Sequence, residues 1–213
     1  MELKKNKMEH QILKPFGPSI IKIKIPQDTI DQINLFVDEI VNNKDKLEKF
    51  NEGSKLAGNV YQEFLMDIDF MKKIKWGEFL GQASNHWIWE EKKSQLKSFQ
   101  IIKSWIVRQF KNEYNPIHFH SGHISGVGYL KVPNTMGTTF QKEKKINYNG
   151  KLVLIDGSKK LFCSPTYIIT PKVGDLYLFP SYLMHTVYPF SETDEERRSV
   201  SFNAKIDDQS SSL

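Results

Sequence analysis

Two histidines separated by one residue are the most chemically informative feature of the sequence. His118 and His120 flank Phe119 in the run Asn-Pro-Ile-His-Phe-His. Side chains at positions i and i+2 of a β-strand point to the same face, so an extended backbone here presents two imidazoles together. Neutral imidazole is a common ligand for transition metals. The pair therefore indicates a metal site, although histidines satisfied only by hydrogen bonds would show the same spacing.

A metal site needs a further ligand from another strand that faces the same cavity. His185 is the candidate, at the end of the run Gly-Asp-Leu-Tyr-Leu-Phe-Pro-Ser-Tyr-Leu-Met-His that begins at Gly174. His123 is an alternative ligand, but its odd offset from His120 directs it away if the strand is regular. Asp175 could orient a ligand histidine through a hydrogen bond, or it could simply be a turn residue.

A second chemical signal is the pair of arginines that opens the last predicted strand. Arg197 shares a strand face with Ser199 and Ser201, whereas Arg198 lies on the opposite face. A buried arginine beside a serine can bind a carboxylate through two charge-assisted hydrogen bonds. The alternative is that both arginines are solvated, because an acidic segment at 192–196 precedes them.

These residues must be positioned by a run of short strands in the second half of the chain. On the strand from Ser98 to Phe110, alternation puts Trp105, Val107 and Gln109 on one face. Proline and glycine residues separate the strands, and many short strands with this punctuation predict a sandwich or barrel. The predicted strands span residues 98–110, 117–120, 125–132, 151–155, 166–170, 175–179, 184–188 and 197–205.

The first part of the chain has a different hydrophobic period. Isoleucines alternate with lysines over 21–25, which predicts a half-buried strand. Apolar residues then recur at helical spacing over 29–50, with Asp28 or Thr29 as the cap and Thr29 with Gln32 in a capping box. A second helix is expected within 63–91, with Phe70, Ile74, Leu80 and Trp87 on its buried side. Both helices should pack on the outside of one sheet.

The length of 213 residues fits a single domain of mainly β structure with N-terminal helices, an α+β fold. We expect a helical N-terminal part over 1–97 that packs on the sheet, a β core over 98–206 and a flexible polar tail over 207–213.

Composition limits the partners and the setting. The net charge is +5, but 30 basic and 25 acidic residues are intermixed without a basic stripe, which argues against nucleic-acid binding. The chain contains one cysteine, Cys163, and this favours a cytoplasmic location because no intramolecular disulfide can form. No apolar run approaches the ~20 residues of a membrane span, and the N-terminus has no signal-peptide pattern.

Taken in order, these motifs resemble the 2-oxoglutarate-dependent Fe(II) oxygenases, most closely the branch familiar from marine phages and bacteria. The resemblance covers roughly residues 100–205 and is carried by His-x-His, by Ser-Gly-Val-Gly-Tyr-Leu from Ser125, by the run ending at His185, and by Arg197-x-Ser with Phe-Asn after it. It implies a double-stranded β-helix, the jelly roll of cupin-like proteins. It also implies Fe(II) bound by His118, His120 and His185, and 2-oxoglutarate bound by Arg197 and Ser199 with help from Tyr129 or Tyr114.

One residue departs from the usual pattern of that family. The second ligand is ordinarily a carboxylate, and here it is His120. Three neutral ligands leave Fe(II) its full +2 charge, which favours dianionic 2-oxoglutarate. Zinc is also stable with three histidines.

The resemblance implies a hydroxylase acting on a small-molecule or peptide substrate, with ascorbate as an accessory reductant. The setting would be the host cytoplasm if the protein is phage-encoded, and a homodimer is compatible with the sequence. One alternative is a cupin-like metalloprotein that does not use 2-oxoglutarate: another dioxygenase, an isomerase or a zinc hydrolase. A third interpretation is a non-catalytic binding or structural protein with vestigial histidines.

Overall fold

The strands of the chain form two antiparallel sheets that face each other. The computed structural model describes residues 9–14, 17–139, 141, 143–157 and 159–207. Seven strands make the larger sheet, in the spatial order β1 His10–Leu13, β2 Ile20–Lys24, β9 Asp175–Pro180, β6 Ile124–Lys131, β11 Arg197–Ile206, β4 Phe99–Gln109 and β3 Gln62–Leu65. The smaller sheet has the order β5 Asn115–His118, β10 Met184–Val187, β7 Leu152–Ile155 and β8 Thr166–Ile169. This is the jelly-roll architecture that the sequence predicts.

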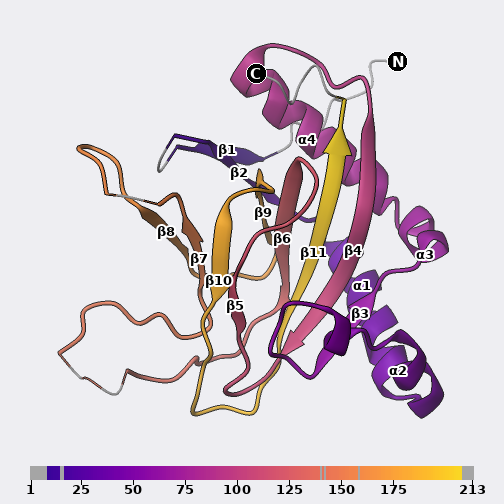
Figure 1. Cartoon of the computed structure of the whole chain (residues 1–213). Coiled ribbons are helices and arrows are strands. Elements are labelled where there is room, and N and C mark those ends of the chain that lie inside the picture. The colour runs from indigo at the N-terminus through magenta and orange to yellow at the C-terminus, as the bar shows by residue number, and fades with distance from the viewer. Residues whose placement is uncertain (1–8, 15–16, 140, 142, 158, 208–213) are drawn as a thin grey trace.

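Helices cover the outer face of the larger sheet (Figure 1). They are α1 Gln27–Val41, α2 Lys44–Phe50, α3 Ile68–Lys73 and α4 Trp76–Lys92, with a short 3₁₀ turn, η1, at Gly53–Lys55. Ile33 of α1 and Leu80 of α4 are fully buried in one apolar cluster with Val200 and Phe202 of β11. The expected packing of helices on one sheet is therefore confirmed. None of the helices in the described part of the chain has the length and apolar character of a membrane-spanning segment.

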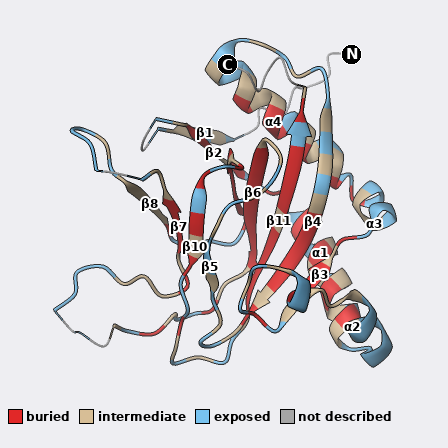
Figure 2. Cartoon of the chain, viewed as in Figure 1, coloured by how far each residue is buried: buried red, intermediate tan, exposed pale blue. Residues whose placement is uncertain are grey.

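A second apolar cluster fills the space between the sheets. Val127 and Tyr129 of β6 pack there with Leu154 of β7 and Val187 of β10. Figure 2 shows the resulting pattern, in which the central strands of the larger sheet are almost continuously buried. A strand buried on both faces loses the alternation of a half-buried strand, and β6 is such a strand.

The helix predictions were partly wrong. The helix expected over 29–50 is two helices, because Asn43 caps α2 by accepting a hydrogen bond from the backbone N–H of Lys46 at 3.0 Å. The predicted capping box is absent: α1 begins earlier, after Pro26, with no side-chain cap. The second helix, expected within 63–91, is α4, which buries Leu80 and Trp87 as predicted. Phe70 is only half-buried and lies on the separate helix α3, because Lys75 adopts a left-handed conformation between the two helices.

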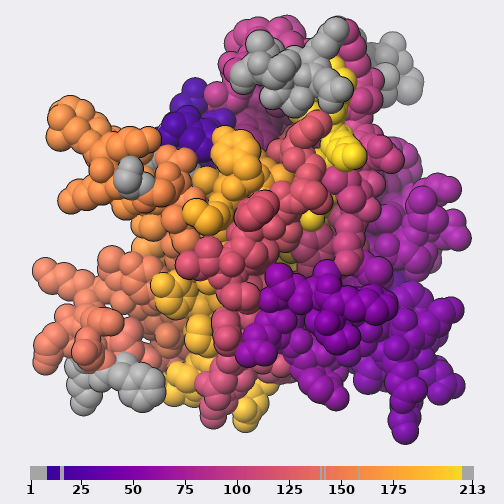
Figure 3. Space-filling model, in the orientation of Figure 1, coloured from indigo at the N-terminus to yellow at the C-terminus, as the bar shows by residue number. Residues whose placement is uncertain are grey.

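The N-terminal part contributes strands as well as helices. The strand expected at 21–25 is β2, whereas β1 and β3 were not predicted. The segment before β3 crosses the lower ends of β4 and β11 (Figures 1 and 3), and Asn59 pairs with Tyr114 just before β5. It therefore links the chain before β3, at the edge of the larger sheet, to the residue that precedes β5. The division at residue 97 stays a prediction, and the predicted tail beyond residue 207 lies outside the described residues.

Candidate metal and cosubstrate site

Three histidines converge between the sheets. His118 ends β5 and pairs directly with His185 of β10. His120 lies two residues beyond β5, where its backbone N–H donates to the Ser181 carbonyl at 3.0 Å. The possible ligand atoms of the three rings all lie within 4.8 Å of one another. Two nitrogens on one ion, with metal–nitrogen bonds of about 2 Å, lie at most about 4 Å apart, so the three rings are close to the spacing that a shared ion requires.

The backbone fixes which ring nitrogen can bind a metal. Nδ1 of His118 lies 2.7 Å from the Pro116 carbonyl, and Nδ1 of His185 lies 2.9 Å from the Leu183 carbonyl. A carbonyl only accepts hydrogen bonds, so each Nδ1 must carry the proton. The Nε2 lone pairs of these two rings are then free for a metal, which is the usual arrangement of histidine ligands.

The surroundings keep two of the imidazoles neutral. Burial, together with the neighbouring His118, lowers the pKa of His185 to about 3. Burial and His118 likewise lower the pKa of His120 to about 4. Aromatic edges complete the enclosure, with Trp105 beside His120 and Phe179 beside His185. Neutral imidazole is the form that binds metal, so these rings do not need to lose a proton at physiological pH.

One cavity connects the histidines to Arg197. Its walls come from both sheets and include the inward-facing residues of β4 and β11 that the alternation predicted. The lining residues are Trp105, Val107, Asn115, His118, His120, Gly126, Val127, Leu152, Phe179, His185, Val187, Arg197, Ser199 and Ser201.

Arg197 is a buried cation with unfilled hydrogen-bonding capacity. Its side chain is 1% exposed, and Nη1 donates to Gln109 Oε1 at 3.1 Å. Nε and Nη2 of Arg197, and the buried hydroxyl of Tyr129, have no hydrogen-bond partner among the described residues. The guanidinium carbon lies 5.1 Å from the centre of the Tyr129 ring. Burial lowers the pKa of Arg197. Unpaired buried donors beside a buried charge are costly, and a carboxylate would satisfy them.

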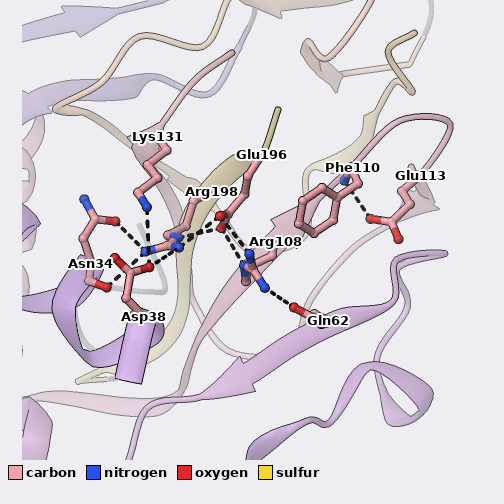
Figure 4. A network of polar contacts seen from close by, with 9 residues as sticks. All are labelled: Asn34, Asp38, Gln62, Arg108, Phe110, Glu113, Lys131, Glu196 and Arg198. Atoms are coloured by element: carbon pink, nitrogen blue, oxygen red, sulfur yellow. Dashed lines mark hydrogen bonds and ion pairs between the residues drawn. The ribbon is translucent and has the colours of Figure 1, made fainter. Parts of the chain in front are cut away.

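Arg198 lies on the opposite face of β11 and, unlike Arg197, has acidic partners. It contacts Glu196 at 2.6 Å and Asp38 at 2.7 Å, and also donates to Asn34 of α1. Figure 4 shows this network, in which Arg108 also binds Glu196. The strand phase inferred from the sequence is therefore right: Arg197 faces the cavity and Arg198 ties β11 to α1.

The structure separates the two candidate tyrosines. Tyr129 is fully buried with its ring beside the Arg197 guanidinium, whereas Tyr114 is 39% exposed; neither is among the residues that line the cavity. The backbone of Tyr114 forms an isolated bridge with Asn59 just before β5. Tyr129 is thus the tyrosine brought to the candidate cosubstrate site.

Two further alternatives are not brought to the histidines. His123 accepts a hydrogen bond from the backbone N–H of Ile206 through its Nδ1 atom, at 3.0 Å. Asp175 is buried, but it forms ion pairs with Lys22 and Lys24 at the start of β9 rather than orienting a histidine. Burial raises the pKa of Asp175, but the two lysines together lower it by more, so the pKa lies below its ordinary value.

Among the aromatic residues near the site, Trp105 and Phe179 line the cavity, whereas Phe110 and Tyr177 do not. Sequence reasoning placed Gln109 on the correct face but assigned it no role. The signal for a role of Gln109 was its place on the same strand face as Trp105 and Val107, on the strand that pairs with the one carrying Arg197.

A comparison with protein-family models gives one match. Residues 103–203 match the family described as "Putative 2OG-Fe(II) oxygenase". These residues contain β4 to β11 up to Asn203, and with them the three histidines and Arg197. No curated protein matches the chain.

Solved structures share the fold at low sequence identity. A prolyl-4-hydroxylase from Pseudomonas putida aligns with a TM-score of 0.53 and 14% identity, over 93% of this chain and 91% of that one. The viral collagen prolyl hydroxylase of Paramecium Bursaria Chlorella virus-1, solved with 2OG, gives 0.52 and 13%, over 87% and 94%. The non-heme alpha-ketoglutarate-dependent epimerase SnoN from nogalamycin biosynthesis gives 0.58 and 11%, over 87% and 76%. The chain thus shares its fold with these three structures along nearly its whole length.

Proposed function

Residues 103–203 belong to the 2OG-Fe(II) oxygenase family, and on this premise we propose which residues of the chain bind iron and cosubstrate. His118, His120 and His185 hold Fe(II). Arg197, with Tyr129 and Ser199, holds the distal carboxylate of 2-oxoglutarate. The chain is accordingly a 2-oxoglutarate-dependent oxygenase, an oxidoreductase, and we propose that it hydroxylates its substrate.

The observation that carries this proposal is a buried Arg197 without an acidic partner among the described residues, in the same cavity as three convergent imidazoles. A structural arginine of this burial would have an acidic partner, as Arg198 has. Arg197 instead keeps two nitrogens without partners among the described residues, beside an equally unpaired tyrosine hydroxyl. A carboxylate accepts such donors through both oxygens. A metal-bound 2-oxo acid with a second carboxylate would satisfy both ends of the cavity at once.

The ligand set supports a dianionic cosubstrate. Bound Fe(II) would supply the activation of dioxygen that couples decarboxylation of 2-oxoglutarate to oxidation of a substrate. His120 stands where such sites usually have a carboxylate, so the three protein ligands are all neutral. The metal charge is then left for 2-oxoglutarate to balance, while buried aromatic side chains exclude water from the rings.

The substrate class is proposed more broadly. Two of the similar structures are prolyl hydroxylases and one is an epimerase. We propose a small-molecule or peptide substrate that approaches beside His118 and His120, which are partly exposed. The chain has a single cysteine, Cys163, and so cannot form an intramolecular disulfide, which favours a cytoplasmic setting.

The experiment is anaerobic reconstitution with Fe(II), followed by addition of 2-oxoglutarate and then dioxygen. We expect metal-dependent 2-oxoglutarate binding and release of succinate, even slowly without substrate. His185→Ala should abolish both, and His123→Ala, a matched histidine outside the site, should preserve both. Metal-loaded protein that neither binds 2-oxoglutarate nor forms succinate would overturn the proposal.

A further inference from the structure

Gln109 accepts a hydrogen bond from the guanidinium of Arg197, with Nη1 and Oε1 3.1 Å apart. It lies on β4 directly opposite Arg197 in the strand register and is fully buried. Its amide nitrogen donates to the carbonyl of Glu113 at 2.6 Å and to the carbonyl of Tyr188 at 3.1 Å. Both N–H groups of the amide thus donate hydrogen bonds, and its oxygen accepts one from the guanidinium of Arg197.

This network determines the orientation of the amide. If the amide were flipped, its oxygen would face two carbonyl oxygens, and its N–H groups would face the N–H donors of Arg197. Neither contact can form a hydrogen bond. The backbone carbonyls of Glu113 and Tyr188 therefore hold Gln109 with its oxygen toward Arg197, and this fixes one edge of the guanidinium.

The nearby acidic side chain is held elsewhere. The carboxylate of Glu113 accepts hydrogen bonds from the backbone N–H groups of Phe110 and Tyr61, at 2.8 and 3.0 Å. Figure 4 shows the contact with Phe110. Only the main-chain carbonyl of Glu113 reaches Gln109. The side chain that accepts a hydrogen bond from Arg197 is therefore the neutral amide of Gln109, although the carboxylate of Glu113 lies only four residues further along the chain.

We propose that Gln109 is a positioning residue that orients Arg197 without neutralising it, and so makes the site select a 2-oxo acid with a second carboxylate. This inference rests on the function proposed above. A glutamate at position 109 would form a charge-assisted pair with the guanidinium and neutralise the positive charge that attracts the ligand. The amide keeps the geometry of such a pair while leaving the positive charge for the ligand.

Two ligands that differ only at the far end test this role. 2-Oxopentanoate has the same chain length as 2-oxoglutarate but ends in a methyl group instead of a carboxylate. Calorimetric titration of both into the Zn(II)-loaded protein, with zinc as a redox-inert replacement for iron, gives dissociation constants without turnover. We expect Gln109→Glu to weaken 2-oxoglutarate binding by at least about 30-fold, and 2-oxopentanoate binding by less than about 3-fold.

Two further variants separate charge from structure. Gln100→Glu makes the same change at an exposed position of β4 and should alter neither constant. Gln109→Met removes the amide without adding charge, and should weaken 2-oxoglutarate binding less than Gln109→Glu does while leaving 2-oxopentanoate binding unchanged. Equal losses for both ligands in Gln109→Glu, or unchanged 2-oxoglutarate binding in Gln109→Met, would overturn the inference. A wild-type protein without any preference would instead refute the proposed cosubstrate site.

Discussion

Glu63 should make the stability of the protein depend on pH. Its side chain is 1% exposed on β3, opposite Val107, and its Oε2 atom has no hydrogen-bond partner among the described residues. Burial raises its pKa from the ordinary value of 4.5 to about 7, with Lys103 opposing and Glu113 adding to the rise. The perturbation we consider is Glu63→Gln, which keeps the shape but cannot ionise.

The size of the effect follows from the difference between the two pKa values. Because the folded state holds the proton more tightly than the unfolded chain, this contribution to stability is present below pH 4.5 and is lost as pH rises through about 7. One pKa unit corresponds to about 1.4 kcal/mol, so the full loss is about 3 kcal/mol. The glutamine variant should avoid this loss, and its advantage over the wild type should grow between pH 5 and pH 8.

The assay is urea unfolding of both proteins at several pH values within this range. The difference in the free energy of unfolding between Glu63→Gln and wild type should rise by about 2–3 kcal/mol from pH 5 to pH 8. Glu48→Gln, at an exposed position of α2, is the matched control and should show no such rise. A pH-independent difference for Glu63→Gln would mean that the carboxyl finds a compensating partner, and the reasoning would fail.

Three other predictions concern the site and its support. Metal analysis after dialysis should find that His118→Ala, His120→Ala and His185→Ala each lose the metal, while His123→Ala retains it; full metal content in His185→Ala would contradict the assignment. Arg197→Met should raise the dissociation constant for 2-oxoglutarate about 100-fold without destabilising the ligand-free protein. Arg198→Met should instead reduce the free energy of unfolding by about 2 kcal/mol and leave 2-oxoglutarate binding unchanged; the reverse pattern in titration and urea unfolding would show that the roles are exchanged. Gly126→Ala should cost about 1–3 kcal/mol in urea unfolding, because its added methyl would lie 3.0 Å from the Tyr177 carbonyl and against Phe202; an unchanged midpoint would show that the strands can move apart.

Strand alternation predicted the parts of the site that depend on local geometry. The spacing of His118 and His120, and the phase of Arg197 against Arg198, follow from the two-residue period of extended backbone. The structure keeps that phase even though His120 lies beyond the end of β5. The convergence of His185 with this pair required the pairing of β10 with β5, which the spacing of residues does not specify; there the resemblance to a family supplied the link.

The elements that the sequence did not predict are those whose stability comes from distant partners. β3 is a four-residue edge strand that exists by pairing with β4, and its Glu63 and Phe64 give no clear alternation of polar and apolar side chains. The break between α1 and α2 depends on the capping preference of an asparagine, which competes with a helical period that continues through it. The helical period indicated which residues would be buried, but not where the backbone would stop.

The contrast between Arg197 and Arg198 shows how one strand can serve both stability and ligand binding. Consecutive residues of β11 point to opposite faces, so two adjacent cations experience unrelated surroundings. Arg198 is saturated by Glu196, Asp38 and Asn34, and this joins the strand to a helix. Arg197 contacts the Gln109 oxygen and the Tyr129 ring, and has no acidic partner among the described residues. An arrangement selected only for stability would have paired both arginines with acids. Because a buried charge without an acidic partner is unfavourable in the ligand-free protein, its presence in the cavity is best explained by an anion that binds there.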